Sequence, residues 1–489
     1  MDFFENFKPI RNKLNTLSLW DILGSLYKMQ KSNKIQLTKE EVEFVYLNSI
    51  VYSADYINSR NEWNQNDWVK ILIQCKELNQ EVNKPLLSPD SDPFDWWRTM
   101  GLNQLKNNSN SYLNQLYRYH YIFSNDTKIR EHVESKINMT YNDFFICSFW
   151  LYSIYGGRNY CFDKEYLLSY DKAPFSSENI LKTLGILSLP LLDLKASLKK
   201  ELRYDENSFN TNGLAGSEVL AFTHLVKPIF EFNNKFYCLF PEQLLHQFTS
   251  GMYYIVEIYK SNKLNDPFGS AFEKYVGLIL EKNNVLKKLR IQPEIPYNDK
   301  QNKTSDWIIE TDDAIVFIEC KTKRLRKESK MYENNEMEDE KTIKESDTIK
   351  IAEAVEQVYK VYAHYSNNEI PGLFFDSSKV FIPIVLTLEE WFAKFPTIND
   401  KITELVKLKL KLKEEDVALV DKYKFHIFSI SEFESIVQIM FSFGFKNYFD
   451  KFNAHEITKE IKENFEYKNY FKDEINCILT ESIRDISRT

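Results

Sequence analysis

The sequence predicts a mixed α+β protein (α+β or α/β class), in which a largely helical N-terminal part precedes a mixed sheet flanked by helices. Two observations lead to this prediction. Residues 1–225 carry apolar side chains at helical spacing, with few glycines and prolines to interrupt them. After Pro228, short runs of β-branched and aromatic residues alternate with helical stretches, which is typical of a sheet covered by helices.

Three helix starts are visible in the N-terminal part. Thr38 stands three residues before Glu41, which is the spacing of a capping box. The polar residues 64–67 precede an apolar stretch that begins at Trp68. A third apolar run, 144–155, is about a dozen residues long; this is too short to cross a bilayer, so the run predicts a buried helix.

The change of character after Pro228 suggests how the chain is divided. The runs 229–232 and 236–240 predict a hairpin, because an Asn-Asn-Lys turn joins them, and a proline then begins a helix. A polar link over 261–267 leads into a helix over 268–282. We therefore expect a helical domain, a hairpin with its connecting helix, a second domain and a helical tail. Their expected bounds are 1–225, 226–265, 266–450 and 451–489.

The second domain carries most of the predicted strands. Its charged stretch 323–347 has no apolar period, so we expect a loop there, followed by a helix over 348–365. Asp312 and Asp313 are typical turn residues between two of the strands. The expected strands cover 285–291, 306–310, 314–321, 380–386 and 424–429.

Charge and cysteine usage restrict the classes of function. The net charge of this 489-residue chain is −8, so a contact with nucleic acid needs a local basic patch, an oligomer or a partner. The six cysteines are scattered, none of them in a CxxC pair, and we find no N-terminal secretory signal. These features favour a reducing cytosol, so we expect a cytoplasmic protein without a membrane span. The seven histidines form no zinc-binding pattern.

The strand predicted after the Asp-Asp turn ends on two charged residues. Glu319 and Lys321 are two positions apart and share one face of the strand, while Cys320 points to the other face. Both faces are apolar at the start of this strand, which predicts a central, covered position. Reflection of the hairpin about its turn places Asp306 opposite residue 318, close to Glu319. Two carboxylates and a backbone carbonyl are the hard oxygen ligands that Mg²⁺ or Mn²⁺ prefers.

Asp306, twelve intervening residues and Glu319-Cys320-Lys321 resemble the D…ExK signature of the PD-(D/E)XK nuclease superfamily. The resemblance covers about residues 266–390. The family's core order of helix, strand hairpin, strand, helix and strand is similar to the order expected above. The resemblance implies a restriction-endonuclease-like core with a mixed central sheet flanked by helices.

Two helices add to the resemblance. Glu273 matches the glutamate that the family often carries on its first core helix, and Gln357 resembles the glutamine that RecB-like members carry on the second. A solvated glutamate and a helix-packing glutamine are the alternatives for these two residues. The sequence departs from the family pattern at Ser305, where many members have proline, and at Val361, where RecB-like members have an aromatic residue.

The resemblance implies an Mg²⁺- or Mn²⁺-dependent nuclease, an endonuclease or an exonuclease, that leaves 5′-phosphate and 3′-hydroxyl ends. Asp306, Glu319 and the Cys320 carbonyl would hold the metal, and Glu273 would bind it directly or through water. Lys321 would orient the attacking water and offset charge on the phosphorane. Gln357 would be a further site residue. A nuclease behind a large helical part also resembles bacterial restriction and antiviral defence effectors.

A basic run follows the strand that carries the signature. Lys323, Arg324, Arg326 and Lys327 predict phosphate contacts, with a solvated loop as the alternative. We expect DNA as the substrate, and either a homo-oligomer or a partner protein from a defence system. Three alternatives stay open: an RNA-directed nuclease, a nucleic-acid- or partner-binding protein on a nuclease fold with catalysis lost or secondary, and a structural Glu–Lys pair.

Overall fold

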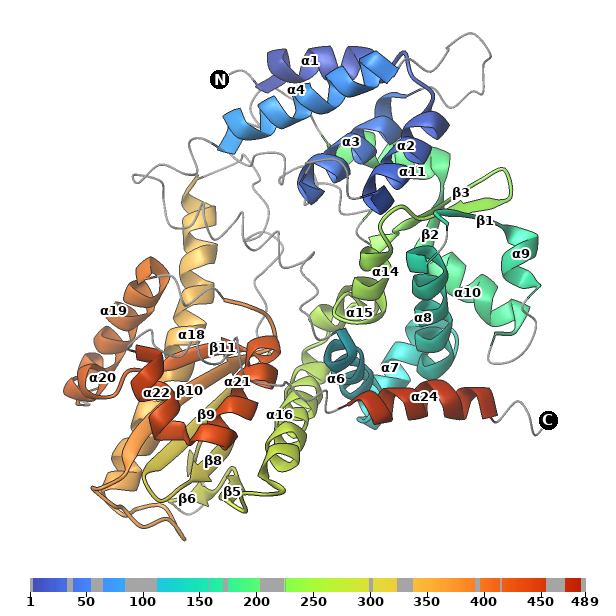
Figure 1. Cartoon of the computed structure of the whole chain (residues 1–489). Coiled ribbons are helices and arrows are strands. Elements are labelled where there is room, and N and C mark those ends of the chain that lie inside the picture. The colour runs from blue at the N-terminus through green and yellow to red at the C-terminus, as the bar shows by residue number, and fades with distance from the viewer. Residues whose placement is uncertain are drawn as a thin grey trace.

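The computed structural model describes a mixed α+β fold (Figure 1). Helices predominate in the N-terminal part and the largest sheet lies in the C-terminal part, as the sequence predicts. Among the described residues, no helix is both long and apolar enough to cross a membrane. The described residues are 3–32, 38–53, 65–83, 112–157, 159–169, 175–202, 224, 226–298, 302–322, 337–391, 396–413, 416–453 and 471–484.

The first helices of the chain pack with a small sheet around one apolar core, in which Phe7, Val45 and Ile71 are fully buried. The predicted capping box is confirmed, because the Thr38 hydroxyl accepts from the Glu41 N–H and the Glu41 carboxylate accepts from the Thr38 N–H. The predicted helix from Trp68 is also confirmed. The helices of this group are α1 (Phe3–Leu14), α2 (Leu19–Ser32), α3 (Lys39–Tyr52), α4 (Gln65–Asn83) and α11 (Leu191–Glu201).

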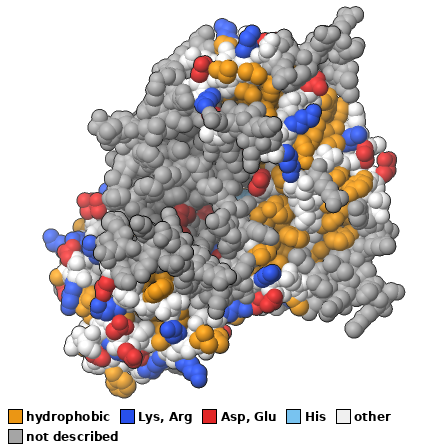
Figure 2. All heavy atoms as spheres, in the orientation of Figure 1, with side chains coloured by type: hydrophobic (Ala, Val, Ile, Leu, Met, Phe, Trp, Pro, Cys, Tyr) orange, Lys and Arg blue, Asp and Glu red, His pale blue; other side chains and the backbone are white. Residues whose placement is uncertain are grey.

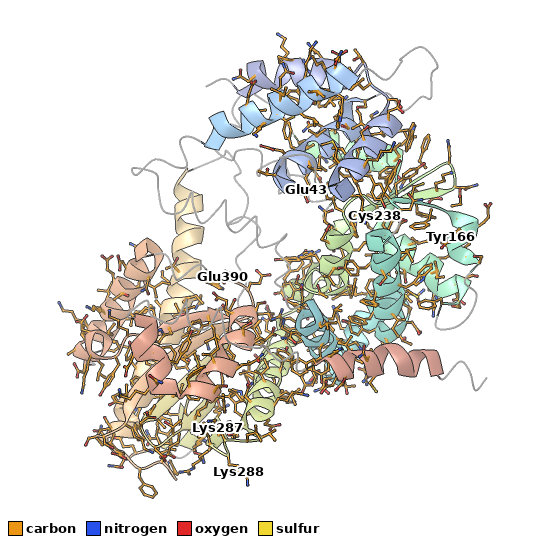
Figure 3. The ribbon with its side chains drawn as sticks, in the orientation of Figure 1. Glu43, Tyr166, Cys238, Lys287, Lys288 and Glu390 are labelled. Atoms are coloured by element: carbon orange, nitrogen blue, oxygen red, sulfur yellow. The ribbon has the colours of Figure 1, made fainter. Side chains whose placement is uncertain are left out.

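The small sheet has the strand order β1-β4-β3-β2. Its antiparallel pair β3 (Ile229–Phe232) and β4 (Lys235–Tyr237) is the predicted hairpin. The strands β1 (Cys161–Asp163) and β2 (Ser188–Pro190) were not predicted, because three residues are too few to show an alternating pattern. Helix α3 lies against this sheet, and Figure 3 shows its Glu43 close to Cys238, which directly follows β4.

A second group of helices connects the small sheet to the C-terminal part. The predicted buried helix is confirmed as α8 (Tyr141–Gly157), in which Phe144, Phe145 and Leu151 are fully buried. Within the predicted tail the described residues form α24 (Lys472–Arg484), which returns to pack beside α6 (Tyr112–Ser124; Figure 1). The other members are α7 (Thr127–Ile137), α9 (Lys164–Leu168), α10 (Ser177–Leu187), α14 (Pro241–Phe248), α15 (Met252–Ile255) and the 3-10 helix η2 (Ile258–Lys260).

The large sheet has the strand order β11-β10-β9-β8-β5. The first three strands in sequence pair antiparallel, whereas β9, β10 and β11 pair parallel, so the predicted mixed sheet is confirmed. Its strands are β5 (Arg290–Pro293), β8 (Trp307–Glu310), β9 (Ala314–Lys321), β10 (Val380–Thr387) and β11 (His426–Ser429). A separate two-stranded ribbon joins β6 (Pro296–Tyr297) and β7 (Asn302–Lys303).

Helices cover both faces of the large sheet. Val316 and Ile318 of β9 belong to the core shared with α16 (Asn262–Asn284) and α21 (Ile430–Phe443). Ile315 and Phe317 belong to the core shared with α18 (Met337–Ser366) and α19 (Pro396–Leu412). The central, covered position predicted for this strand is therefore confirmed. The last helices of this part are α20 (Ala418–Lys422) and α22 (Phe445–Asn453).

Several element boundaries differ from the predictions; β4 ends at Tyr237 rather than at residue 240, and β11 begins at His426 rather than at residue 424. Helix α16 begins at Asn262, inside the stretch that was predicted as a polar link. Strand β5 begins at Arg290, because a turn over residues 285–287 follows the end of α16 at Asn284. Helix α18 begins at Met337, so the predicted loop over 323–347 is wrong from residue 337 onward. A charged stretch without an apolar stripe can still extend a helix whose later turns are anchored by packing.

The core of α16 and the large sheet is continuous with that of α6, α7 and α8. Leu116 and Val133 from the helical part and Val276 and Val316 from the sheet part are all fully buried within it. This packing places the helical part directly against the helix that carries Glu273. The four predicted segments of the chain stay a prediction.

Candidate active site

The hairpin that carries Asp306 and Glu319 turns through Asp312 and Asp313. The Thr311 N–H donates to the Ala314 carbonyl at 2.9 Å, so the loop has two residues, one fewer than the expected turn over residues 311–313. The strand pairing joins Trp307 to Ile318. Our reflection about Asp312 therefore misplaced the register by one residue. The centre lies between the two aspartates, and continuing the register brings Asp306 level with Glu319 rather than with residue 318.

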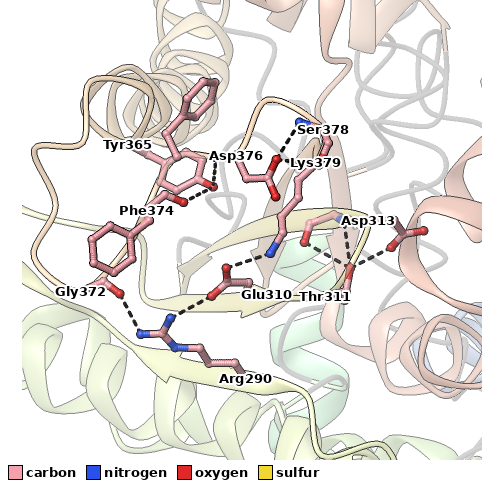
Figure 4. A network of polar contacts seen from close by, with 12 residues as sticks. Arg290, Glu310, Thr311, Asp313, Tyr365, Gly372, Phe374, Asp376, Ser378 and Lys379 are labelled. Carbon is pink, nitrogen blue, oxygen red and sulfur yellow. Dashed lines mark hydrogen bonds and ion pairs between the residues drawn. The ribbon is translucent and has the colours of Figure 1, made fainter.

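The turn end of the large sheet is held by ion pairs (Figure 4). The Glu310 carboxylate accepts from Arg290 at 3.0 Å and from Lys379 at 2.9 Å, which joins strands β5 and β8 to the residue before β10. Arg290 also donates to the Gly372 carbonyl at 2.8 Å. Lys287 and Lys288 lie near this end of the sheet in Figure 3, and Glu390 lies near the opposite end, where β9 and β10 finish.

Asp306 precedes the first paired residue of β8. Its Oδ2 accepts from the Cys320 N–H at 2.6 Å, in place of a ladder bond between backbones. The N–H and C=O of one strand residue point to the same side, so the Cys320 carbonyl also faces Asp306. Burial raises the pKa of Asp306, while the Cys320 N–H and the Lys321 charge act in the opposite direction.

Glu319 is only 2% exposed, which is unusual for a carboxylate. The Lys321 ammonium donates to its Oε1 at 2.6 Å, and its Oε2 has no hydrogen-bond partner in the described part of the chain. Burial and the neighbouring Asp306 charge raise the pKa of Glu319, and Lys321 opposes this shift. Burial lowers the pKa of Lys321, but the charges of Glu319 and Asp306 outweigh burial and raise it.

Glu273 reaches this group from α16. The Trp307 Nε1–H donates to the Glu273 carbonyl at 3.0 Å, and the Trp307 ring leaves no room for a side chain at Gly277, where an added Cβ would lie 2.3 Å from it. Helix α16 is thereby fixed against the strand that Asp306 precedes. Burial, and then the charges of Asp306 and Glu294, raise the pKa of Glu273 to about 7.

Glu294 is a fourth carboxylate that the sequence analysis missed. It follows β5, and the pairing of Pro293 with Trp307 places it level with Asp306 when the register is continued. Glu294, Asp306 and Glu319 therefore lie at one level, at the ends of the neighbouring strands β5, β8 and β9. Glu294 also pairs with Lys303 at 2.8 Å. The sequence offers no local signal for Glu294, because only the pairing of β5 with β8 aligns it with the other two acids.

The remaining predicted site residues are not joined to this cluster. Gln357 is half-buried on α18, and among the described residues it has no hydrogen bond to Asp306, Glu319 or Lys321. Its role as a site residue stays a prediction. The basic residues Lys323, Arg324, Arg326 and Lys327 lie outside the described residues. Figure 2 shows acidic and basic side chains interspersed over the part that contains the large sheet.

The chemistry of the donor set fits a divalent cation. Glu273, Asp306 and Glu319 crowd together, each with a pKa raised in part by burial, and one buried oxygen of Glu319 has no donor within the described residues. A hard cation would relieve both features. Among the described residues, the side chains as they are positioned include no group of three or more His, Cys, Asp or Glu residues that could hold a metal ion.

Comparisons with protein-family models, with curated proteins and with solved structures found no match for this chain.

Proposed function

We propose that this chain is a metal-dependent nuclease that hydrolyses phosphodiester bonds of DNA, with Asp306, Glu319 and Lys321 at its centre. The observation that carries the proposal is that the continued register aligns Glu294, Asp306 and Glu319 at the ends of β5, β8 and β9, with Lys321 bonded to the buried Glu319. Acidic groups crowded at the end of a sheet are destabilising unless a cation or a substrate compensates them. This arrangement supports a catalytic site over a structural Glu–Lys pair.

The order of elements also supports the proposal. Helix α16, strands β5, β8 and β9, helix α18 and strand β10 follow one another in the order that the resemblance to PD-(D/E)XK nucleases implies. Glu273 comes from the first of these helices and lies close enough to Asp306 for their charges to interact. The position of Glu273 therefore supports the proposal beside the spacing of the motif.

Asp306, Glu319 and the Cys320 carbonyl would hold Mg²⁺ or Mn²⁺, with Glu273 contributing directly or through water. When bound, the ion would polarise the phosphodiester and lower the pKa of a bound water. The chain's own contribution is to orient and to balance charge. Lys321, held at 2.6 Å from Glu319, would orient the attacking water and stabilise charge on the phosphorane. The resemblance implies 5′-phosphate and 3′-hydroxyl products.

The test is cleavage by the purified full chain. Wild type should cut plasmid or linear DNA with Mg²⁺ or Mn²⁺ and should lose this activity in EDTA. Glu319→Gln should abolish cleavage, because the variant keeps the shape of the side chain but loses the carboxylate. Glu310→Gln is the matched control: it lies on the same hairpin at the turn end of the sheet and should cleave normally. Normal cleavage by a folded Glu319→Gln protein would end the assignment.

RNA should be tested in the same assay, because the cluster of carboxylates does not distinguish DNA from RNA. Cleavage of RNA alone would replace DNA as the substrate and leave the site unchanged. Binding of nucleic acid without cleavage under any metal condition would instead support a binding protein on a nuclease fold. A role in bacterial restriction or antiviral defence, with a homo-oligomer or a partner protein, is part of the proposal and rests on the resemblance alone.

A further inference from the structure

Three buried polar side chains, one each from α6, α16 and α21, meet between these helices. Arg118 of α6 is 3% exposed, Glu434 of α21 is 2% exposed and Tyr275 of α16 is fully buried. Arg118 Nη1 lies 2.9 Å from Glu434 Oε1, and the Tyr275 hydroxyl donates to the same oxygen at 2.8 Å. Asn114, also on α6, is a further hydrogen-bond partner of Glu434. The helical part and the sheet part are therefore joined by directional bonds as well as by apolar packing.

Stability alone does not explain these three residues. A buried ion pair must overcome the loss of hydration of both charges, and apolar side chains of similar volume often stabilise a core equally well or better. What apolar side chains do not supply is direction. A hydrogen bond weakens steeply away from its preferred distance and angle, so it fixes a helix more sharply in rotation and translation than apolar contacts do.

The network acts on the helix that carries Glu273. Tyr275 is two residues further along α16, and since each residue turns the helix by about 100°, the two side chains point to nearly opposite sides. On the sheet side, Trp307 donates to the Glu273 carbonyl and packs against Gly277. The segment from Glu273 to Gly277 is thus held from two sides, by Trp307 next to Asp306 and by Tyr275 through Glu434.

We propose that Arg118, Glu434 and Tyr275 are positioning residues, through which the helical part sets the place of Glu273 relative to Asp306 and Glu319. This inference rests on the proposed function, because Glu273 matters here as a contributor to the metal site. It assigns the helical part a role at the site without placing any of its residues there. A shift of α6 would be passed to Glu273 through Glu434 and Tyr275.

The first variant is Tyr275→Phe in the full chain, which removes one hydroxyl and leaves the ring. We expect its affinity for Mn²⁺, measured by calorimetry, to fall about tenfold, in the range seen when residues that orient metal ligands are changed. The Mg²⁺ concentration for half-maximal cleavage should rise by the same factor. The rate at saturating Mg²⁺ should return close to that of wild type, which a general loss of folding would not produce.

Tyr155→Phe is the matched control. It also removes a buried hydroxyl, which donates to the Phe236 carbonyl at 3.1 Å. This contact lies in the helical part, away from the carboxylates of the large sheet. Its effect on thermal stability should resemble that of Tyr275→Phe, but Mn²⁺ affinity should not change. Should the two variants bind Mn²⁺ equally well, the network is only structural and the proposal is wrong.

A second variant removes both charges, Arg118→Met together with Glu434→Met. A single substitution would leave one buried charge without its partner, whereas the double variant keeps the volume apolar and should fold. We expect the same weakening of Mn²⁺ binding in this folded protein. Unchanged affinity would overturn the positioning role while leaving the nuclease proposal intact. A wild-type protein that neither binds Mn²⁺ nor cleaves nucleic acid would overturn both.

Discussion

The two ends of the β8–β9 hairpin show how similar residues can serve opposite purposes. At the turn end, Glu310 is balanced by Arg290 and Lys379. At the other end, four carboxylates gather around two lysines, Lys303 and Lys321. The first arrangement satisfies its own charges. The second has two more carboxylates than lysines in a partly buried place, and this excess, rather than the presence of a Glu–Lys pair, distinguishes a candidate site from a structural contact.

The largest expected effect is a loss of activity when residues at the carboxylate end of the hairpin are changed. Asp306→Asn should remove both Mn²⁺ binding and cleavage, because it removes a carboxylate from the proposed metal ligands. Lys321→Met should lower cleavage by about 10²- to 10³-fold but retain Mn²⁺ binding, since its charge matches the transition state. Cleavage assays and calorimetry on the same preparations measure both. Equal loss of Mn²⁺ binding in the two variants would contradict separate roles.

Gly277→Ala tests how tightly the protein is packed at the site end, the end of the hairpin that carries the carboxylates. The added Cβ would lie 2.3 Å from the Trp307 ring, so we expect a loss of about 1–3 kcal/mol in the free energy of unfolding. Gly185→Ala on α10 is the control, because nothing lies within 4 Å of its added Cβ. It should gain about 0.5–1 kcal/mol from helix propensity. Urea unfolding of the two variants gives the comparison. An unchanged free energy of unfolding in Gly277→Ala would show that the Trp307 ring moves aside at little cost.

The pH dependence of stability should differ at the site end. The pKa of Glu273 is raised in the folded protein from its usual value near 4.5 to about 7, so its protonated form favours the folded state. Its favourable contribution is complete below about pH 4.5 and is lost as the pH rises through 7. In EDTA, Glu273→Gln should therefore gain stability relative to wild type over this interval and keep the gain above it. Parallel stability–pH curves for the two proteins would exclude a raised pKa.

The smallest effect is expected at the turn end. Glu310→Gln weakens the contacts to Arg290 and Lys379, which lie near the surface, so it should cost about 1 kcal/mol or less. The loss should shrink at high salt, which screens such pairs. Thermal unfolding at low and high salt measures this. A large, salt-independent loss would mean that the turn end resembles a buried network more than a surface one.

Local patterns in the sequence determined the elements that carry the site. A continuous apolar run predicted β9 with its observed bounds, and two aspartates predicted the turn before it. The same spacing predicted that Asp306 and Glu319 would meet. These predictions hold because strand and turn preferences depend on neighbours along the chain. A two-residue turn then pairs the strand before it with the strand after it.

Only the tertiary structure decided which distant residues join them. Glu294 aligns with Asp306 through the pairing of β5 with β8, and Arg118 bonds Glu434 across 316 positions of sequence. Neither residue stands in a motif, because the identity of a packing partner is set by how helices and strands dock. The hairpin register was also missed by one residue for this reason: the sequence marks a turn, and backbone hydrogen bonding decides which two residues form it.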